Sequence, residues 1–364
     1  MPILQKIVVQ NWRNIELQEL DFSPNINCIS GNNGEGKTNL LDAIYYLSMT
    51  KSAFGTSDKF NFRKGTEEFA LAGNYLMENG LTSKVTLKVS TSAEKKILRD
   101  GKAYNRISEH IGMLPIVMVS PADSALVSEG GEERRRFVTS VLSQIDREHL
   151  KSMQQYLKLL AQRNALLKSD YCSDDVLDSI EYSMDKAASS IYAVRKEFIH
   201  NLLPSVQNFY DSLSSGKENV KIEYRSDLQK GPLGDLLHRN RQKDKLLGFT
   251  SAGIQRDDFV FLMNGDPIRK TGSQGQQKSF LVALKFAQYE LMKNCYGFPP
   301  ILLLDDLFDK LDMQRTENLL SMVAGEDFGQ IFLSDTNKVR LSSIVEKITT
   351  QSCYYEAEGG AFKK

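Results

Sequence analysis

The segment with the clearest chemical meaning is a glycine-rich stretch that fits the pattern G-x-x-x-x-G-K-[ST]. It follows residues 25–30, which we predict to be a short buried strand, and precedes residues 39–48, where Leu40, Ile44 and Leu47 recur at helical spacing. A strand, a glycine loop and a helix in this order aim backbone N–H groups and the positive end of a helix dipole at one anion. The residues of the loop are Gly31, Asn32, Asn33, Gly34, Glu35, Gly36, Lys37 and Thr38.

The anion expected in this loop is a nucleotide phosphate, and the last two residues of the motif would have separate tasks. The Lys37 ammonium would reach the β- and γ-phosphates, and the Thr38 hydroxyl would ligate the Mg²⁺ that bridges them. A glycine-rich turn that carries a surface lysine is the alternative interpretation. The strand and helix on either side favour the phosphate loop, known as Walker A.

A pair of carboxylates lies far downstream of this loop. The apolar run 300–304 leads directly into Asp305 and Asp306, which is how a buried parallel strand delivers acids to its C-terminal edge. As a Walker B motif, Asp305 would hold Mg²⁺ through its water shell and Asp306 would polarise the attacking water. Without the glycine loop, a buried strand ending in a polar turn would be the simpler interpretation.

A third motif opens a predicted helix just before the Walker B run. Serine and glycine at a helix start can hold an anion, and they can equally form a polar helix cap. In proteins that resemble ABC ATPases, an S-x-G-Q signature lies across a dimer interface and closes on the γ-phosphate held by the other subunit. The motif consists of Ser273, Gln274, Gly275 and Gln276, and the apolar helical positions after it are Phe280, Leu284 and Ala287.

Two segments follow the Walker B carboxylates. Residues 307–312 match the placement of a D-loop in such ATPases, with Asp312 as the expected interface residue. Residues 330–335 form a second apolar run that ends in polar residues, and we predict that it is the last core strand.

The order P-loop, long insert, signature, Walker B and D-loop is that of the SMC and Rad50 type of ATPase head. Within that group the chain resembles the RecF family of bacterial recombinational-repair proteins, and the resemblance covers nearly the whole chain. It rests on NWRN (11–14), GNNGEGKTNLLDAIYYLS (31–48), SPADSALVSEGGEERRRF (120–137), QRNALLK (162–168), QRDD (255–258), SQGQQKS (273–279) and ILLLDDLFDKLD (301–312).

The resemblance implies an α/β, ABC-type ATPase head with an inserted helical arm, divided at 1–119, 120–241 and 242–364. It implies ATP with Mg²⁺, ATP-dependent head-to-tail homodimerisation on double-stranded DNA at gaps, and slow hydrolysis that releases the DNA. The task it implies is loading of RecA together with RecO and RecR, in the cytoplasm. It also places Arg13, Asn14 and Asn39 near the nucleotide, although a plain strand-to-turn role competes for the first two.

The chain departs from the RecF pattern at two places and from transporter ATPases at others. Glycine stands at Gly55 where the family usually has arginine, and Ile254-Gln255 replaces proline and histidine. A transporter-type ATPase would carry glutamate at the position of Asp306 and a histidine after residues 330–335. The shorter aspartate and the missing histidine predict slow hydrolysis.

The insert carries two runs of apolar residues spaced by three and four, which is typical of a helical seam. We predict two antiparallel helices joined by the polar turn 169–175, with the second ended or kinked at Pro204. A short coiled-coil arm and a small helical bundle share this pattern. The positions are Leu150, Met153, Leu157, Leu160 and Leu167 in the first run, and Ile180, Met184, Ala187, Ile191, Val194 and Phe198 in the second.

The charge balance bears on a DNA partner. The chain has 46 basic and 46 acidic residues, so a polyanion would have to meet a local basic face. Residues 51–106 hold 11 Lys/Arg against 6 Asp/Glu, which suggests contact with the duplex backbone. A solvated face of a β-rich lobe is the alternative. The densest part of this face consists of Lys51, Lys59, Arg63 and Lys64.

The remaining composition excludes several classes of protein. The 4 cysteines form no CxxC pair, which argues against a disulfide framework or a zinc site. No apolar run has the length of a signal peptide or a membrane span, so we expect a cytosolic protein without a membrane partner. A small-molecule P-loop kinase or another monomeric NTPase remains a rival function. An ABC transporter subunit fits poorly, because 236 positions separate Lys37 from Ser273.

Overall fold

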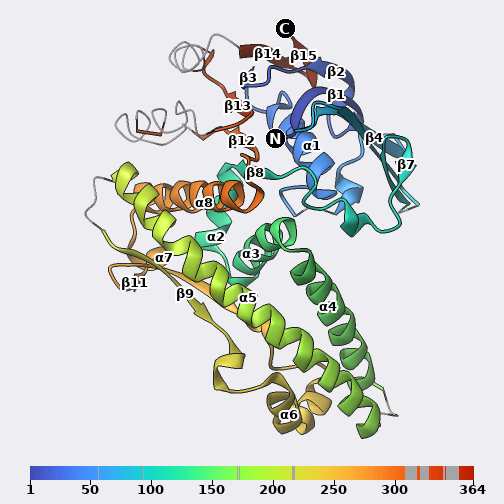
Figure 1. Ribbon diagram of the computed structural model, residues 1–364, viewed down its shortest axis with the longest axis vertical. Helices are drawn as coiled ribbons and strands as arrows, with labels where there is room; N and C mark the ends of the chain where they lie inside the picture. The colour runs from blue at the N-terminus through green and yellow to red at the C-terminus, as the bar shows by residue number, and fades with distance from the viewer. Residues whose placement is uncertain are drawn as a thin grey trace. The chain divides into compact units, whose positions relative to one another are not determined.

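The structure is a computed structural model that describes most of the chain (Figure 1). The described residues are 1–55, 57–92, 94–169, 171, 173–214, 218–307, 318–319, 328–338, 341 and 352–364. The chain separates into two compact units, unit 1 (Met1–Asp123, Ser212–Ser214 and Val282–Lys364) and unit 2 (Ser124–Asp211 and Ser215–Leu281). The lobe boundaries after residues 119 and 241 stay a prediction.

Unit 1 is built on a six-stranded sheet whose strand order is β15-β14-β3-β13-β12-β8. All of its pairings are parallel except that of β14 with β15. The strands β3, β12 and β13 are buried at every residue, because parallel strands are normally covered on both faces. The bounds are β3 Ile26–Ser30, β8 Ile116–Val119, β12 Ile301–Asp305, β13 Ile331–Asp335, β14 Ser352–Glu358 and β15 Ala361–Lys363.

The prediction that residues 330–335 form the last core strand is wrong, because β14 continues the sheet beyond β13 in sequence and pairs with β3. Buried and exposed residues alternate toward the end of β14. That pattern belongs to a strand covered on one face, so the segment lacks the continuous apolar run that marks the central strands.

A second six-stranded sheet in unit 1 is antiparallel, with the order β2-β1-β4-β5-β6-β7. Trp12, at the end of β1, is fully buried and meets Tyr46 and Phe69 edge-on at centroid distances of 5.1 and 4.9 Å. Tyr46 belongs to α1 (Lys37–Met49), the helix that follows the glycine loop, so the aromatic cluster ties that helix to the second sheet. The bounds are β1 Ile3–Trp12, β2 Ile15–Asp21, β4 Glu68–Leu76, β5 Thr82–Ser90, β6 Lys95–Arg99 and β7 Lys102–Ala103.

Unit 2 combines helices with a small antiparallel sheet of order β11-β10-β9. Its core joins residues of α4 and α5 to Leu233 and Leu237 of α6 and to Ile254. The insert is therefore a small bundle and not a two-helix coiled coil. The bounds are α2 Ala125–Ser128, α3 Gly131–Ile145, α4 Arg147–Leu167, α5 Asp174–Ser214, β9 Val220–Arg225, α6 Leu233–Leu247, β10 Asp258–Met263, β11 Asp266–Pro267, α7 Ile268–Thr271 and α8 Gln274–Tyr296, of which the last continues into unit 1.

The predicted seam of the insert needs one correction, and one of the two outcomes predicted for Pro204 is wrong. Leu157 is 52% exposed, whereas Tyr156 beside it is fully buried, because the third helix covers a wider stripe of α4 than a two-stranded seam would. Pro204 does not end the second helix, since α5 continues through it to Ser214. Proline removes the N–H that would bond the carbonyl of His200, and His200 is exposed, so water can satisfy that carbonyl.

Candidate functional site

The glycine loop connects β3 to α1, and two of its glycines are required by close contacts. Gly31 has φ 146°, and a Cβ there would lie 2.6 Å from the carbonyl oxygen of Ala357. Gly36 caps α1 with φ 108°, and a Cβ there would lie 2.9 Å from the side chain of Asn14. A side chain at Gly31 would clash with the backbone of β14, and at both positions the φ value is one that L-residues rarely adopt.

The lysine of the loop points into it. Lys37 is only 3% exposed, and its ammonium donates to the carbonyl oxygens of Gly31 at 2.7 Å and Asn32 at 3.0 Å. The turn between β14 and β15 anchors the loop from outside, because the Gly360 N–H donates to the carbonyl oxygen of Glu35 at 2.9 Å. A fixed positive charge inside a curled loop at a helix N-terminus is what phosphate binding needs.

The structure brings the Walker A and Walker B residues into direct contact. The Thr38 hydroxyl donates to the Asp305 carboxylate, 3.0 Å from Oδ1 and 2.8 Å from Oδ2. Ser334, which is paired with Asp305 across β12 and β13, donates to Oδ1 at 2.6 Å. A hydroxyl and a carboxylate side by side are the oxygen ligands that Mg²⁺ prefers.

The pKa of Asp305 reflects opposing influences. Burial raises it above the usual range, and the neighbouring charge of Asp306 acts in the same direction. The hydrogen bonds from Ser334 and Thr38 and the charge of Lys37 lower it. A cation bound at this carboxylate would act in the same direction as Lys37 and favour its ionised form.

Asp306 adopts a left-handed backbone conformation, with φ 42°. Its N–H donates to the carbonyl oxygen of Ser334 at 3.2 Å and to the Ser334 hydroxyl oxygen at 3.1 Å. A non-glycine residue in this region costs about 1 kcal/mol or more, and such strain is concentrated at functional sites. Ser334 therefore holds both carboxylate residues in place.

Ser334 was not predicted as a site residue. The only sequence signal is that a polar residue ends an otherwise apolar strand. Its contact with Asp305 depends on β13 lying next to β12 in register, and the order of strands in a sheet cannot be read from one sequence.

Arg13 occupies a polar cluster beside α1. Its guanidinium donates to the Asn39 side-chain oxygen at 3.0 Å and to the Asp42 carboxylate at 2.5 Å. The carboxylate of Asp42 is fully buried, and burial raises its pKa while Arg13 opposes that shift most strongly. Ser52 also donates to Asp42, at 2.8 Å. Arg13 thus neutralises a buried carboxylate of α1, a contact that its sequence position alone does not reveal.

Asn14 and Asn39 lie next to the last glycine of the loop. The Asn39 amide donates to the Asn14 side-chain oxygen at 2.7 Å, and Asn14 fills the space against Gly36. The structure therefore places Arg13, Asn14 and Asn39 together at the N-terminal turn of α1. Whether they contact a nucleotide stays a prediction.

The signature residues belong to unit 2 and form a capping box at the start of α8. The Ser273 hydroxyl accepts from the Gln276 N–H at 3.3 Å, and the Gln276 side-chain oxygen accepts from the Ser273 N–H at 2.8 Å. Gln276 also donates to Glu218 at 2.8 Å. Ser273 and Gln274 are exposed, so this cap leaves them accessible to a second molecule. Asp312, the predicted D-loop residue, lies outside the described residues.

The four residues predicted to contact DNA are all in unit 1. Lys51, Lys59 and Lys64 are exposed, and the Lys59 ammonium lies 4.9 Å from the ring centroid of Phe60. Arg63 makes an exposed ion pair with Glu16 at 2.8 Å. Exposed cations of this kind can meet phosphates, and the ion pair of Arg63 is weak enough to exchange.

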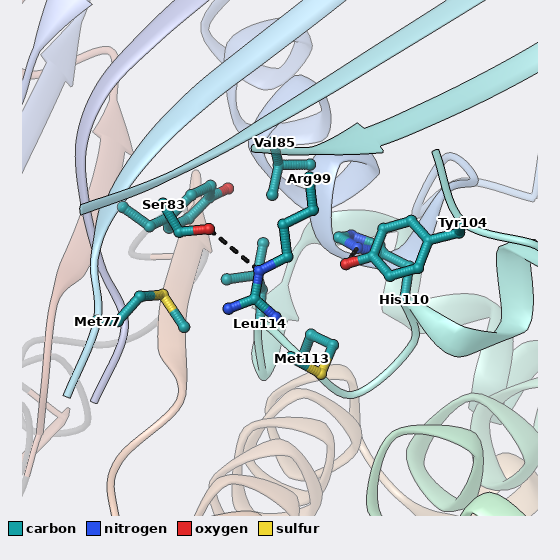
Figure 2. A pocket seen from close by; sticks show the side chains of 9 residues that line it. Met77, Ser83, Val85, Arg99, Tyr104, His110, Met113 and Leu114 are labelled. Atoms are coloured by element: carbon teal, nitrogen blue, oxygen red, sulfur yellow. Dashed lines mark hydrogen bonds between the residues drawn. The ribbon is translucent and has the colours of Figure 1, made fainter. Parts of the chain in front are cut away.

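A small pocket in unit 1 supports the far end of α1 (Figure 2). His110 is fully buried, with Nε2 2.7 Å from the Leu47 carbonyl oxygen and Nδ1 3.2 Å from the Tyr104 hydroxyl. A carbonyl can only accept, so Nε2 carries the proton and Nδ1 accepts from Tyr104. Burial lowers the pKa of His110, and Arg99 in the same pocket donates to Ser83 at 3.1 Å. This is a structural polar cluster.

Two of the segments that carry the family resemblance, 120–137 and 255–258, contact each other through hydrogen bonds in unit 2. Arg134, from the first of them, binds the Asp258 carboxylate through two hydrogen bonds of 2.8 and 3.1 Å. Asp257 accepts from Arg195 at 2.6 Å. At the departure from the family pattern, Ile254 is part of the unit 2 core and Gln255 accepts from Tyr156. These residues hold the bundle to the small sheet.

A parallel sheet that brings a glycine loop and a Walker B carboxylate into contact, with a helical insert, defines an ABC-type P-loop ATPase head. The sequence profile of the RecF/RecN/SMC N terminal domain matches residues 3–352. The DNA replication and repair protein RecF of Phocaeicola vulgatus is 43% identical over 360 residues, which cover 98% of this chain and 97% of that protein. The chain therefore belongs to the RecF family, as its motifs indicated.

Solved structures agree with this assignment. The recombination mediator protein RecF with ATP, from the RecFOR pathway, superimposes with a TM-score of 0.90 and 28% identity, covering 100% of this chain and 97% of that one. The Smc head domain of Pyrococcus furiosus shares the fold, with a TM-score of 0.57, 14% identity and coverage of 100% and 96%. None of the described helices combines the length and the apolar character needed to cross a lipid bilayer.

Proposed function

We propose that this chain is an ATP-dependent clamp on double-stranded DNA that acts in recombinational repair. The contact of Thr38 with Asp305 carries the proposal, because it joins the two halves of a nucleotide site. Membership of the RecF family supports it, since a RecF relative has been solved with ATP.

At the ATP site, the loop N–H groups and the Lys37 ammonium would bind the phosphates. Thr38 and Asp305 would hold Mg²⁺, which when bound neutralises charge on the phosphates. Asp306 would polarise the attacking water, and Ser334 would keep both aspartates in position. A serine at the end of β13, with no histidine at that place, supports slow hydrolysis.

The site would be completed by a second copy of the chain. Ser273, Gln274, Gly275 and Gln276 would cap the γ-phosphate bound by the other copy, and Asp312 would lie at the same interface. ATP would favour the closed dimer because only that state contacts the γ-phosphate from both sides. Hydrolysis would release the DNA.

The basic face would contact the DNA backbone in the closed dimer. The exposed cations Lys51, Lys59 and Lys64 support this, together with Arg63. The relatives named DNA replication and repair protein RecF support a role in DNA repair. Within that role we propose that the clamp acts at gapped DNA, as the family resemblance implies. The RecFOR pathway, to which the solved RecF structures are assigned, supports RecO and RecR as partners. We propose RecA loading as the outcome and the cytoplasm as the place of action, as the family resemblance implies.

Duplex binding measured with and without ATP tests this function. ATP should increase the affinity for duplex DNA, and Lys37→Arg should abolish the increase. Raising the salt concentration from about 50 to 200 mM should weaken binding steeply, because phosphate contacts release counterions. Equal affinity with and without ATP in the unmodified protein would contradict the proposal.

A further inference from the structure

A groove in unit 2 lies between α5 and β9 and has no part in the proposed ATPase site; we call it the α5–β9 groove. Its volume is about 520 Å³, which falls in the range of ~300–1,000 Å³ typical of ligand sites. Figure 1 shows β9 running beside α5, and the ring centroids of Tyr192 and Tyr224 lie 5.5 Å apart across them. The lining residues are Tyr192, Lys196, Ile199, His200 and Leu203 of α5, Ile222 and Tyr224 of β9, and Gln229.

The strand that borders the groove is an edge strand. In the described part of the chain β9 pairs only with β10, so one side of its backbone faces away from the sheet. Two contacts identify which residues face outward. The Val220 N–H donates to the Gln207 side chain at 2.8 Å, and the Tyr224 carbonyl accepts from Gln229 at 2.8 Å.

Main-chain groups of an antiparallel strand alternate in direction, so Ile222 faces outward together with Val220 and Tyr224. No described residue outside the β9–β10 ladder hydrogen-bonds to the N–H or C=O of Ile222. Edge groups of this kind are a template for another strand. A peptide added there would place every second side chain on the same face as Ile222 and Tyr224, which is the face toward α5.

The chemistry of the groove favours an acidic peptide with apolar residues. Ile199 and Ile222 are 7% and 4% exposed and form an apolar base. Lys196 and His200 are exposed one helical turn apart on α5, and the lining contains no acidic residue. Neither Lys196 nor His200 forms an ion pair with a described residue.

We propose that the α5–β9 groove binds an extended acidic segment of a partner protein, which adds to β9 as a further strand. The backbone of Ile222 supplies the hydrogen bonds of the added strand. The apolar base receives one or two of its side chains, and Lys196 and His200 bind its carboxylates. This inference does not depend on ATP binding.

Selection from a displayed library of random peptides of about twelve residues, on the full-length protein, tests the proposal. Selected peptides should alternate apolar residues with Asp or Glu. On binding, the backbone amide of Ile222 should become protected from hydrogen exchange. Lys196→Glu should weaken a selected peptide by at least about ten-fold, or ~1.4 kcal/mol.

Lys158→Glu is the matched control, because Lys158 is exposed on α4 and does not line the groove. It should leave peptide affinity unchanged. Peptides that bind the Lys196→Glu and Lys158→Glu variants equally well would overturn the proposal. So would a groove that selects no acidic peptide, or one that binds a labelled oligothymidylate in a Lys196-dependent manner.

Discussion

Asp305 is almost fully buried, and two hydroxyl groups from different segments stabilise its charge. The sequence predicted Lys37, Thr38 and Asp305 as site residues because the glycine-loop and Walker B motifs define their types and spacing. It could not identify Ser334, or Asp42 as the partner of Arg13, because those contacts depend on how distant segments are placed. Motif residues are readable locally, whereas the groups that orient them are set by the tertiary fold.

Replacing Ser334 tests its positioning role at this scale. Ser334→Ala removes the hydrogen bond to Asp305 and one acceptor of the Asp306 N–H. A hydrogen bond to a charged group contributes ~1.5–3 kcal/mol, so kcat for ATP should fall by roughly ten-fold or more. ATP affinity should change little, because Lys37 and the loop remain.

Ser30→Ala is the control for this substitution. Ser30 ends the neighbouring strand β3, and its hydroxyl donates to the Tyr355 carbonyl oxygen. It should leave kcat close to that of the unmodified protein. Equal losses from the two substitutions would mean that Ser334 has no specific effect on the carboxylates.

The elements that carry the site were the most predictable ones. The strand β12 follows from a continuous apolar run, β3 from its place directly before the glycine loop, and the helices α1 and α8 from helical spacing. β14 was missed because its alternating pattern resembles an exposed segment. In unit 2, spacing alone suggested a two-helix seam, and the contribution of α6 to the core could not be inferred without its position in space.

The start of α8 provides a prediction at the scale of the element. Ser273→Arg should prevent ATP-dependent dimerisation, because a bulky cation would stand where the signature is proposed to meet the other copy. ATP affinity should remain nearly intact, since the P-loop is unchanged. Nucleotide titration and mass measurement on the same variant check both parts.

Ser273→Ala separates the helix cap from the interface in this experiment. Like Ser273→Arg, it removes the hydrogen bond that the Ser273 hydroxyl accepts from the Gln276 N–H, but it adds no bulk. Loss of this cap should cost the helix about 1 kcal/mol. Dimerisation of this variant should be weakened less than that of Ser273→Arg. If Ser273→Arg abolishes ATP affinity and dimerisation together, the motif acts within one chain.

At the scale of the whole molecule, the chain is formally neutral, with 46 basic and 46 acidic residues. Long-range attraction to DNA is therefore weak unless basic faces are combined, and doubling the number of phosphate contacts in a dimer steepens the salt dependence of binding. Family membership and the fold were both accessible from the sequence, because the motifs are specific and occur in a fixed order.

The mass of the full-length protein by light scattering, with and without ATP, tests the central claim most directly. The account predicts a monomer without nucleotide, a dimer with ATP and Mg²⁺, and no change of mass for Lys37→Arg under either condition. An unmodified protein that binds ATP and keeps the mass of a monomer would contradict the clamp and favour a monomeric kinase or another NTPase.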